Sequence, residues 1–156
     1  MKLDPWYITG ISEREAAFTY SIASKKRVNL YFAIRLTHTD ALLLKEIKDF
    51  FGVGNIYHVK ASKLTSNSDN INRTEYYRVT NLNDLAVIVR HFDAYPIHGR
   101  KKHLYEIWKN IYLLKQEDNI SQNVLWRLVY ALSLLTTKNQ NSFMKKSFTE
   151  KDEQNG

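Results

Sequence analysis

Apolar and polar residues alternate along two neighbouring stretches of the chain, residues 17–22 and 29–36, which the basic segment SKKRV separates. A repeat of two predicts β-strands with one face in a core and the other face outside it. The residues expected on the inner faces are Phe18, Tyr20, Ile22, Leu30, Phe32, Ile34 and Leu36. The two strands therefore predict a hairpin whose outer face is polar, aromatic and basic.

Apolar residues three and four positions apart predict helices in much of the remaining chain. Asp4-Pro5 is a helix-start signal, because an acidic N-cap precedes proline at the first helical position. The short helix that begins there covers Pro5–Arg14. Further helices are expected over THTDALLLKEIKDFFG, NLNDLAVIVRHF, Lys102–Lys115 and about Ser121–Leu135, and further strands over Asn55–Lys60 and Thr74–Thr80.

The resulting order of elements is α-β-β-α-β-β-α-α-α. Two antiparallel hairpins with helices over one sheet face describe an α+β fold whose other sheet face stays exposed. A polar loop, SKLTSNSDNINR, joins the third and fourth strands. We expect residues 1–135 to form a single domain and residues 136–156 to form a polar, flexible tail.

Charge narrows the range of partners. Lys and Arg number 23 against 16 Asp and Glu, a net charge of +7. This favours polyanions, nucleic acid first and an anionic membrane surface second, but such a surplus also occurs in proteins that bind neither. The absence of cysteine excludes disulfides, zinc–thiolate sites and thiol nucleophiles. No apolar run is long enough to cross a bilayer and no signal-peptide pattern is present, so no membrane is expected.

The order of elements, together with three stretches of sequence, resembles the LAGLIDADG family of homing endonucleases and the related organellar intron maturases. The stretches are WYITGISEREAAF, LYFAIRLTHTDALLLKEIKDFFGVGNIY and YYRVTNLNDLAVIVRHFDAYPIHGRKKHLYEIW. The resemblance covers about residues 4–115. It implies an αββαββα fold whose antiparallel four-stranded sheet forms a saddle across the major groove of double-stranded DNA.

The resemblance also implies a homodimer, because the family packs its signature helices in pairs and one signature is present here. Gly10 is then a point of close backbone approach between two helices, with Thr9 and Glu13 beside it in the interface. The alternative for Gly10 is a tolerated surface glycine, although glycine costs a helix interior about 1 kcal/mol. For Glu13, a role in helix or interface structure is favoured over chemistry.

When the first position of the family signature is aligned with Ile8, the family's catalytic acid corresponds to Glu15. A carboxylate there would bind Mg²⁺, which phosphodiester hydrolysis needs to activate water and to neutralise charge. His38 occupies the position of the family's usual glutamine and could orient water, or it could only cap the helix at Asp40. Lys101 follows the Tyr-Pro turn and would stabilise the transition state, or it could belong to a solvated run of charges.

Strand parity selects the residues expected to face DNA. Arg35 and Arg78 could each make bidentate hydrogen bonds to guanine, and Asn29 could pair with adenine. Basic residues at the hairpin tip would contact phosphates. The alternative is that the outer face of the sheet is an ordinary solvent-exposed face. The full set of predicted contacts is Ser21, Lys25, Lys26, Arg27, Asn29, Tyr31, Arg35, Tyr57, Tyr76, Arg78 and Lys102.

Two departures from the signature argue against cleavage. Arg14 replaces a small residue where the paired helices come closest, and Ala16 replaces a glycine that eases the turn into the strand. The chain is therefore either a metal-dependent DNA endonuclease, or a catalytically degenerate nucleic-acid-binding protein or maturase that acts on intron RNA. A basic protein-interaction module is a third alternative. The resemblance places the protein in a mitochondrion or chloroplast.

Overall fold

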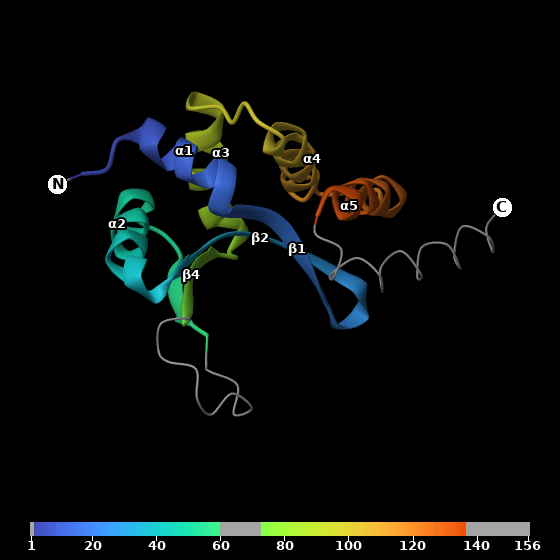
Figure 1. The fold of residues 1–156 in the computed structure, drawn as a ribbon. Helices are drawn as coiled ribbons and strands as arrows, with labels where there is room; N and C mark the ends of the chain where they lie inside the picture. Colours follow the sequence, from blue (N-terminus) through green and yellow to red (C-terminus); the bar gives the residue numbers. More distant parts are fainter. Residues whose placement is uncertain (1, 60–72, 137–156) are drawn as a thin grey trace. The chain divides into compact units, whose positions relative to one another are not determined.

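The computed structural model describes residues 2–59 and 73–136. The chain forms two compact units, Met1–Gly99 and Arg100–Gly156. Among the described residues, the first unit holds α1, α2, α3 and a four-stranded sheet, and the second holds α4 and α5 (Figure 1). Most of the polar loop before the fourth strand, and the tail beyond Thr136, lie outside the described residues. The expectation of a single domain stays a prediction.

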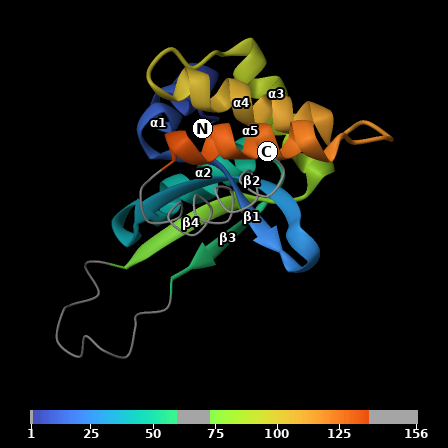
Figure 2. The same cartoon turned by 90° about the vertical axis from the view of Figure 1, so that its right-hand side faces the viewer.

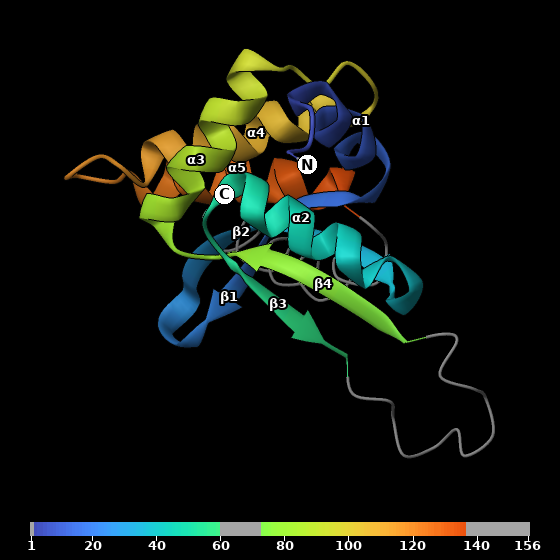
Figure 3. The ribbon, with the colours of Figure 1, turned by 90° about the vertical axis from the view of Figure 1, so that its left-hand side faces the viewer.

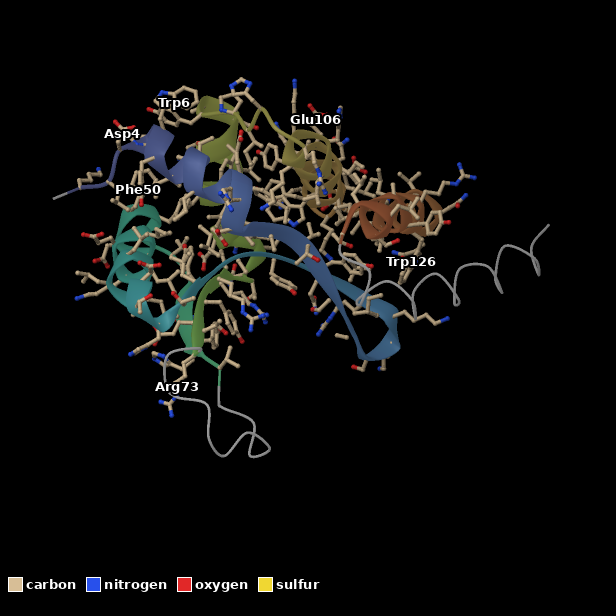
Figure 4. All side chains as sticks on the ribbon, in the orientation of Figure 1. Asp4, Trp6, Phe50, Arg73, Glu106 and Trp126 are labelled. Atoms are coloured by element: carbon tan, nitrogen blue, oxygen red, sulfur yellow. The ribbon has the colours of Figure 1, made fainter. Side chains whose placement is uncertain are left out.

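The first helix, α1 (Pro5–Glu15), begins where the sequence predicts. The side chain of its N-cap, Asp4, accepts a hydrogen bond from the backbone N–H of Trp6 at 2.8 Å. Ile8, Thr9 and Ser12 form its buried side, and Trp6 projects from its outer side (Figure 4). The chain enters the first strand directly after Glu15, so the end of this helix and the start of the sheet are joined without a loop.

The sheet is antiparallel throughout and has the order β1-β2-β4-β3. Figures 2 and 3 show its four strands side by side, with β1 and β3 on the two edges. The α+β fold is therefore confirmed. The strands are β1 (Ala16–Ala23), β2 (Arg27–Thr37), β3 (Asn55–His58) and β4 (Thr74–Val79).

Helices α1, α2 (Ala41–Phe51) and α3 (Leu82–Ala94) lie over one face of this sheet (Figure 3). An aromatic cluster fills the space between the layers, with the ring of Phe32 5.2 Å from that of Phe18 and 5.7 Å from that of Phe92. Edge-to-face and tilted ring pairs of this kind add to the free energy gained by burying aromatic surface. The other buried residues of these elements include Leu30, Ile34, Leu44, Ile47, Tyr77, Val79, Leu85 and Ile88.

The connection after α2 depends on two glycines with positive φ. Gly52, at φ 73°, ends the helix in the left-handed conformation. Gly54, at φ 84°, lies so close to β4 that a Cβ would come within 2.7 Å of the carbonyl oxygen of Arg78. The loop is further held by Tyr77, whose buried hydroxyl donates to the carbonyl of Val53 at 2.7 Å. This packing brings β3 alongside β4.

The tip of the first hairpin departs from the expected pattern. Ile22 has the parity of the core face but is 37% exposed. Ile22 lies on the edge strand β1, close to the hairpin tip that extends past α1, α2 and α3 (Figure 1), whereas its cross-strand partner Val28 on β2 is buried. The turn itself contains Lys25 and Lys26 at φ 60° and 57°, a region that residues with a Cβ seldom adopt. The prediction that Ile22 is buried was therefore wrong.

The second unit contains α4 (Lys101–Leu114) and α5 (Gln122–Leu135), which pack against each other. The buried side of α4 includes Tyr105, Trp108 and Ile111. Ser121 caps α5, where its hydroxyl oxygen accepts the N–H of Val124 at 3.4 Å. None of the helices within residues 2–59 and 73–136 combines the length and the hydropathy required of a membrane span.

Candidate nucleic-acid interface and active site

The register of the sheet determines which side chains share its open face. Cross-strand partners point to the same side, and the pairs Ser21–Asn29, Arg35–Tyr76 and Tyr57–Tyr76 alternate with core pairs such as Phe18–Phe32. The structure thus brings together, on the face opposite the helices, seven of the residues expected to contact DNA. They are Ser21, Asn29, Tyr31, Arg35, Tyr57, Tyr76 and Arg78.

Arg78 lies between two tyrosines on this face. Its guanidinium carbon is 4.3 Å from the ring centroid of Tyr31 and 4.9 Å from that of Tyr76. Tyr57 stacks on Tyr76 in turn, with ring centroids 5.3 Å apart and an interplanar angle of 20°. Cation–π contacts on two sides restrict the rotamers of the arginine. Its Nε is buried and has no hydrogen-bond partner among the described residues.

Arg35 is held differently. Its Nε and Nη2 both donate to the hydroxyl oxygen of Thr74, at 3.1 and 2.8 Å. The side chain is exposed, and a guanidinium carries further N–H groups for a ligand. Thr74 faces the same side as Arg35 on the neighbouring strand and was not among the predicted site residues, because only the pairing of β2 with β4 places it there.

The hairpin tip adds an exposed cationic group to one end of this surface. Lys25, Lys26 and Arg27 are all exposed, and the first two lie in the turn itself. Long cationic side chains on a protruding turn suit contacts with phosphates, which hold a duplex in place without reading its sequence.

Glu15 is the last residue of α1, and its side chain is exposed. The next residue, Ala16, pairs with Ile34, so the end of α1 lies level with Arg35 on β2. Within the part of the chain that the structure describes, the carboxylate of Glu15 has neither a hydrogen-bond nor an ion-pair partner. The predicted acid therefore has free oxygen atoms at the point where α1 meets the edge strand β1.

Glu13 has a different environment from Glu15. Its Oε1 accepts the backbone N–H of His98 at 2.7 Å and that of Gly99 at 3.3 Å. These hydrogen bonds tie α1 to the turn that follows Tyr95-Pro96. They agree with the interpretation that Glu13 supports structure, and they distinguish the two glutamates of the signature by their contacts.

The side chain of Thr9 faces α3 of its own chain. Its hydroxyl donates to the carbonyl of Tyr95 at 2.8 Å, and its oxygen lies 3.2 Å from Nε2 of His91. Because the hydroxyl proton is used on the carbonyl, Nε2 of His91 must be the donor in the second contact. Burial lowers the pKa of His91 to about 4, so this imidazole is neutral at pH 7. The buried Thr9 side chain thus joins α1 to α3.

Gly10 lies on the exposed side of α1, and a Cβ placed there would meet nothing within 4 Å. This space would admit a second helix, and it also permits the alternative of a tolerated surface glycine. Because the Thr9 side chain is turned inward, the predicted helix pair depends mainly on Gly10 and its exposed neighbours Tyr7 and Arg14.

His38 follows β2 directly, and its backbone N–H donates to the carbonyl of Arg73 at 2.7 Å. Its Nδ1 lies 2.8 Å from Oε1 of Glu75, and Nδ1 of His58 lies 2.9 Å from the same oxygen. The imidazole therefore contacts Glu75 rather than capping the helix after Asp40. The hydrogen bond from His38, together with that from His58, lowers the pKa of the Glu75 carboxyl, although burial opposes this shift.

Glu75 and His58 were missed in the sequence. Both have the parity of the core face, on β4 and β3 respectively, and each pairs directly with the other across the two strands. The signal that could have identified Glu75 is its place in the alternating series Glu75, Tyr77, Val79, where an acidic side chain occupies an inward position. A buried carboxylate needs hydrogen-bond partners, and here two histidines supply them.

Lys101 and Lys102 open α4 in the second compact unit, where the first is half-buried and the second exposed. Their predicted roles at the scissile phosphate and on DNA stay predictions. Among the residues that the structure describes, no group of three or more His, Asp or Glu side chains is arranged to hold a metal ion.

These features define an α+β protein with an open, basic and aromatic sheet face beside a helix that ends in an exposed carboxylate. The model of the LAGLIDADG endonuclease family matches residues 8–112, and the chain belongs to this family. The family assignment made from the sequence is thereby confirmed.

Among curated relatives, the chain is 33% identical over 129 residues to a 50.9 kDa protein in ND4 intron 1 of Podospora anserina, which covers 77% of this chain and 26% of the relative. It is 30% identical over 117 residues to probable intron-encoded endonuclease 3 of Neurospora crassa, covering 72% of this chain and 20% of the relative. The chain thus spans about a quarter or less of the length of these relatives.

Among solved structures, the LAGLIDADG meganuclease I-CpaMI bound to uncleaved DNA is 27% identical, with a TM-score of 0.75 over 97% of this chain and 50% of that chain. The homing endonuclease I-TnaI has a TM-score of 0.76 at 17% identity, over 96% of this chain and 99% of that chain. The second likeness concerns the fold alone. In length, this chain corresponds to half of the first protein and to nearly all of the second.

Proposed function

We propose that the chain is a homing-type endonuclease that cleaves double-stranded DNA at specific sites as a metal-dependent homodimer. The observation that carries this proposal is the exposed Glu15 at the end of α1, level with Arg35 of a sheet whose open face presents Arg35, Arg78 and three tyrosines. Membership of the LAGLIDADG endonuclease family and the likeness to a DNA-bound meganuclease support it.

The residues at the end of α1 fit a hard divalent cation such as Mg²⁺. Glu15 offers a carboxylate without a competing partner in the described residues, and the C-terminus of a helix favours positive charge. Mg²⁺ is commonly bound by one or two carboxylates together with water and substrate phosphates. When bound, the metal would activate water and neutralise phosphate charge. One chain supplies one such carboxylate, so the second is expected from a partner copy.

The other residues have separate tasks in this proposal. Arg78 and Arg35 would read guanine edges in the major groove, and Asn29 would pair with adenine. Lys25, Lys26 and Arg27 at the hairpin tip would contact phosphates. Lys101 would stabilise the negative charge that develops on the attacked phosphate.

The homodimer would form through the exposed side of α1. A single copy corresponds to half of the meganuclease I-CpaMI, and a duplex has two strands to cut. Gly10 leaves space for a second helix, and two copies of Glu15 would then converge over one groove. Analytical ultracentrifugation with and without duplex tests this step: a protomer that stays single on its DNA contradicts it.

A catalytically silent nucleic-acid-binding protein, or a maturase that binds intron RNA, is the alternative function. The observation that favours it is Arg14, a bulky cation on the exposed side of α1 next to Glu15. Ala16 gives it less support, because this residue is buried with ordinary extended backbone angles, and its methyl group is accommodated as the first residue of β1.

The relative encoded in an intron of ND4, a mitochondrial gene, supports a mitochondrial location. A chloroplast stays the alternative. Detection of the protein in fractionated organelles of its source would decide between them.

The test of function is a selection for cleavage on random duplexes in the presence of Mg²⁺, repeated with Glu15→Gln. Double-strand cuts by the wild type and none by the variant support the endonuclease. Binding of selected duplexes without cuts by the wild type contradicts it and favours the alternative. Preference for an intron RNA over unrelated RNA of equal length would then identify a maturase.

A further inference from the structure

The end of the sheet that lies beyond Glu15 carries a group of three titratable side chains: His38, Glu75 and His58. One oxygen of Glu75 contacts Nδ1 of both imidazoles, at 2.8 and 2.9 Å. The carboxylate side chain is 7% exposed, whereas that of His38 is 59% exposed. Solvent and substrate can therefore reach the imidazole of His38 but not the carboxylate behind it.

We propose that Glu75 is a positioning residue that holds His38 with Nδ1 protonated, so that Nε2 accepts the proton of the water that attacks DNA. This inference rests on the proposed endonuclease function and adds a proton acceptor to it. A carboxylate hydrogen-bonded to a histidine fixes the tautomer and ring orientation, and it stabilises the imidazolium that forms when the ring accepts a proton.

The tautomer follows from hydrogen-bond chemistry. An ionised carboxylate only accepts hydrogen bonds, so each Nδ1 that contacts Glu75 must carry a proton. The lowered pKa of Glu75 agrees with an ionised carboxylate at neutral pH. A neutral imidazole with a proton on Nδ1 has its lone pair on Nε2, the nitrogen that makes no contact with Glu75.

His38 lies at the same end of the sheet as the acid. Ala16 pairs with Ile34, so the end of α1 is level with Arg35, and His38 follows Arg35 by three residues, immediately beyond the end of β2. Three residues of extended backbone span roughly 10 Å. In this proposal the imidazole of His38 and the carboxylate of Glu15 act on the same phosphodiester.

The elements that carry or adjoin the three side chains also hold other charged groups. His58 faces Glu75 from β3, Arg73 precedes β4, Asp40 precedes α2, and Lys45 and Lys48 lie on α2. Among these, only the two histidines contribute to the pKa shift of Glu75. We assign His58 the role of a second donor that keeps Glu75 ionised when His38 is neutral.

The proposed step conserves atoms and charge. Water loses a proton to Nε2 of His38, and its oxygen forms a bond to phosphorus. One P–O bond of the phosphodiester then breaks, and the leaving oxygen takes a proton from solvent water. The imidazolium of His38 returns its proton to solvent, with Glu75 unchanged throughout. A divalent cation held by Glu15, as in the proposed function, would neutralise the phosphate.

His38→Gln is the decisive variant, because glutamine is the family's usual residue here and can orient water without accepting a proton. We expect His38→Gln and Glu75→Gln each to slow single-turnover cleavage about a hundredfold, the lower range for general base catalysis, with unchanged affinity for the duplex. The double variant should be no slower than either single one. Asp49→Asn, which removes an exposed acid from α2, is the matched control and should cleave normally.

Two readouts separate a proton acceptor from a merely structural residue. The rate of wild-type cleavage should rise with pH through an inflection that His38→Gln lacks, and added imidazole should restore cleavage to His38→Ala. A His38→Gln enzyme that cleaves at the wild-type rate with the wild-type pH profile overturns the inference while the proposed function stands. Thermal unfolding of each variant identifies any loss of rate that comes from misfolding.

Long-range ¹H–¹⁵N spectra of the histidine rings test the positioning role without any cleavage. The wild type should show His38 protonated on Nδ1, and Glu75→Gln should shift the proton towards Nε2. Protonation of wild-type His38 on Nε2 overturns the inference. If the expected tautomer is found in a protein that cuts no duplex, the positioning by Glu75 is supported and the endonuclease function has failed.

Discussion

The guanidinium carbon of Arg78 on β4 lies 4.3 Å from the ring centroid of Tyr31 on β2. The residue of β2 directly across from Arg78 is Ala33. The contact between Arg78 and Tyr31 joins two residues that are far apart in the sequence. It orders, before any ligand arrives, a side chain that in free solution has many rotamers. An arginine that is ordered in advance loses less entropy when it binds a base.

From this contact we expect Arg78→Ala to weaken binding to a cognate duplex by about 1–3 kcal/mol and to relax discrimination at one base pair. Tyr31→Ala should have a smaller effect in the same direction, and Tyr31→Phe, which keeps the ring, should have little effect. Titrations with duplexes substituted at each position, at one fixed salt concentration, measure this. Arg90→Ala, on the exposed side of α3, is the control. Equal loss at every base pair would contradict a role in reading sequence.

The hairpin tip should supply affinity without specificity. We expect Lys25→Ala combined with Lys26→Ala to weaken binding to cognate and unrelated duplexes alike, because phosphate contacts are independent of sequence. The slope of log K against log salt should become less steep by about 1 for each phosphate that the variant no longer neutralises. Lys45→Ala on α2 should leave the slope unchanged. A slope that is equal in the tip variant and the wild type would rule out phosphate contacts there.

The two glutamates of the signature, which differ in their hydrogen bonds, should also differ in what their substitution changes. Glu13→Gln should lower the free energy of unfolding by about 1 kcal/mol, because it replaces a charge-assisted acceptor of two backbone N–H groups with a neutral one. Glu15→Gln removes no such hydrogen bond, so it should leave stability unchanged and abolish cleavage.

Urea unfolding and a cleavage assay of both variants test this separation. The variants serve as controls for each other, since each removes one carboxylate from the same helix. Cleavage at the wild-type rate by Glu15→Gln would remove the acid from the proposed mechanism.

His91 should make stability depend on pH. Burial lowers its pKa in the folded protein from 6.5 to about 4, so between these values the unfolded chain binds the proton that the folded chain does not. Stability contributed by the neutral imidazole is therefore complete above pH 6.5 and is lost as pH falls towards 4, by up to about 3 kcal/mol. Urea unfolding at a series of pH values measures the loss.

His91→Gln should flatten this dependence. Glu75, whose pKa is lowered from 4.5, destabilises the fold only when its carboxylate is protonated at lower pH, so the two residues act over different ranges. A His91→Gln protein whose stability still falls as steeply between pH 6.5 and 4.5 would assign the effect to another group.

Gly10→Ala distinguishes an interface glycine from a tolerated one. Because a Cβ at this helical position meets nothing within 4 Å, the change should raise the stability of the protomer by about 0.5–1 kcal/mol. If a second α1 packs against it, the same methyl group should weaken dimerisation and cleavage. Chemical unfolding and sedimentation of one variant provide both measurements. A more stable protomer with unchanged assembly would support the surface alternative.

Local sequence patterns determined most of the secondary structure. Asp4-Pro5 begins α1, alternation marks β1 and β2, and helical spacing marks α3 to within a few residues. Each of these signals depends on residues within one element, where backbone geometry requires a period of 2 or 3.6. The same parity correctly assigned Arg35, Tyr76 and Arg78 to one face, because alternation does not depend on which strands are neighbours.

The contacts between elements depended on tertiary structure. The pairing of β4 between β2 and β3 brings Arg78 to Tyr31 and joins His38 to Glu75 and His58. The packing of α1 on α3 turns Thr9 inward to His91. A register shift of one residue would move every side chain of β4 to the opposite face while leaving the sequence pattern of each strand unchanged. The packing of the whole core determines which strands pair and in which register. No single segment of the sequence is therefore sufficient to predict this pairing.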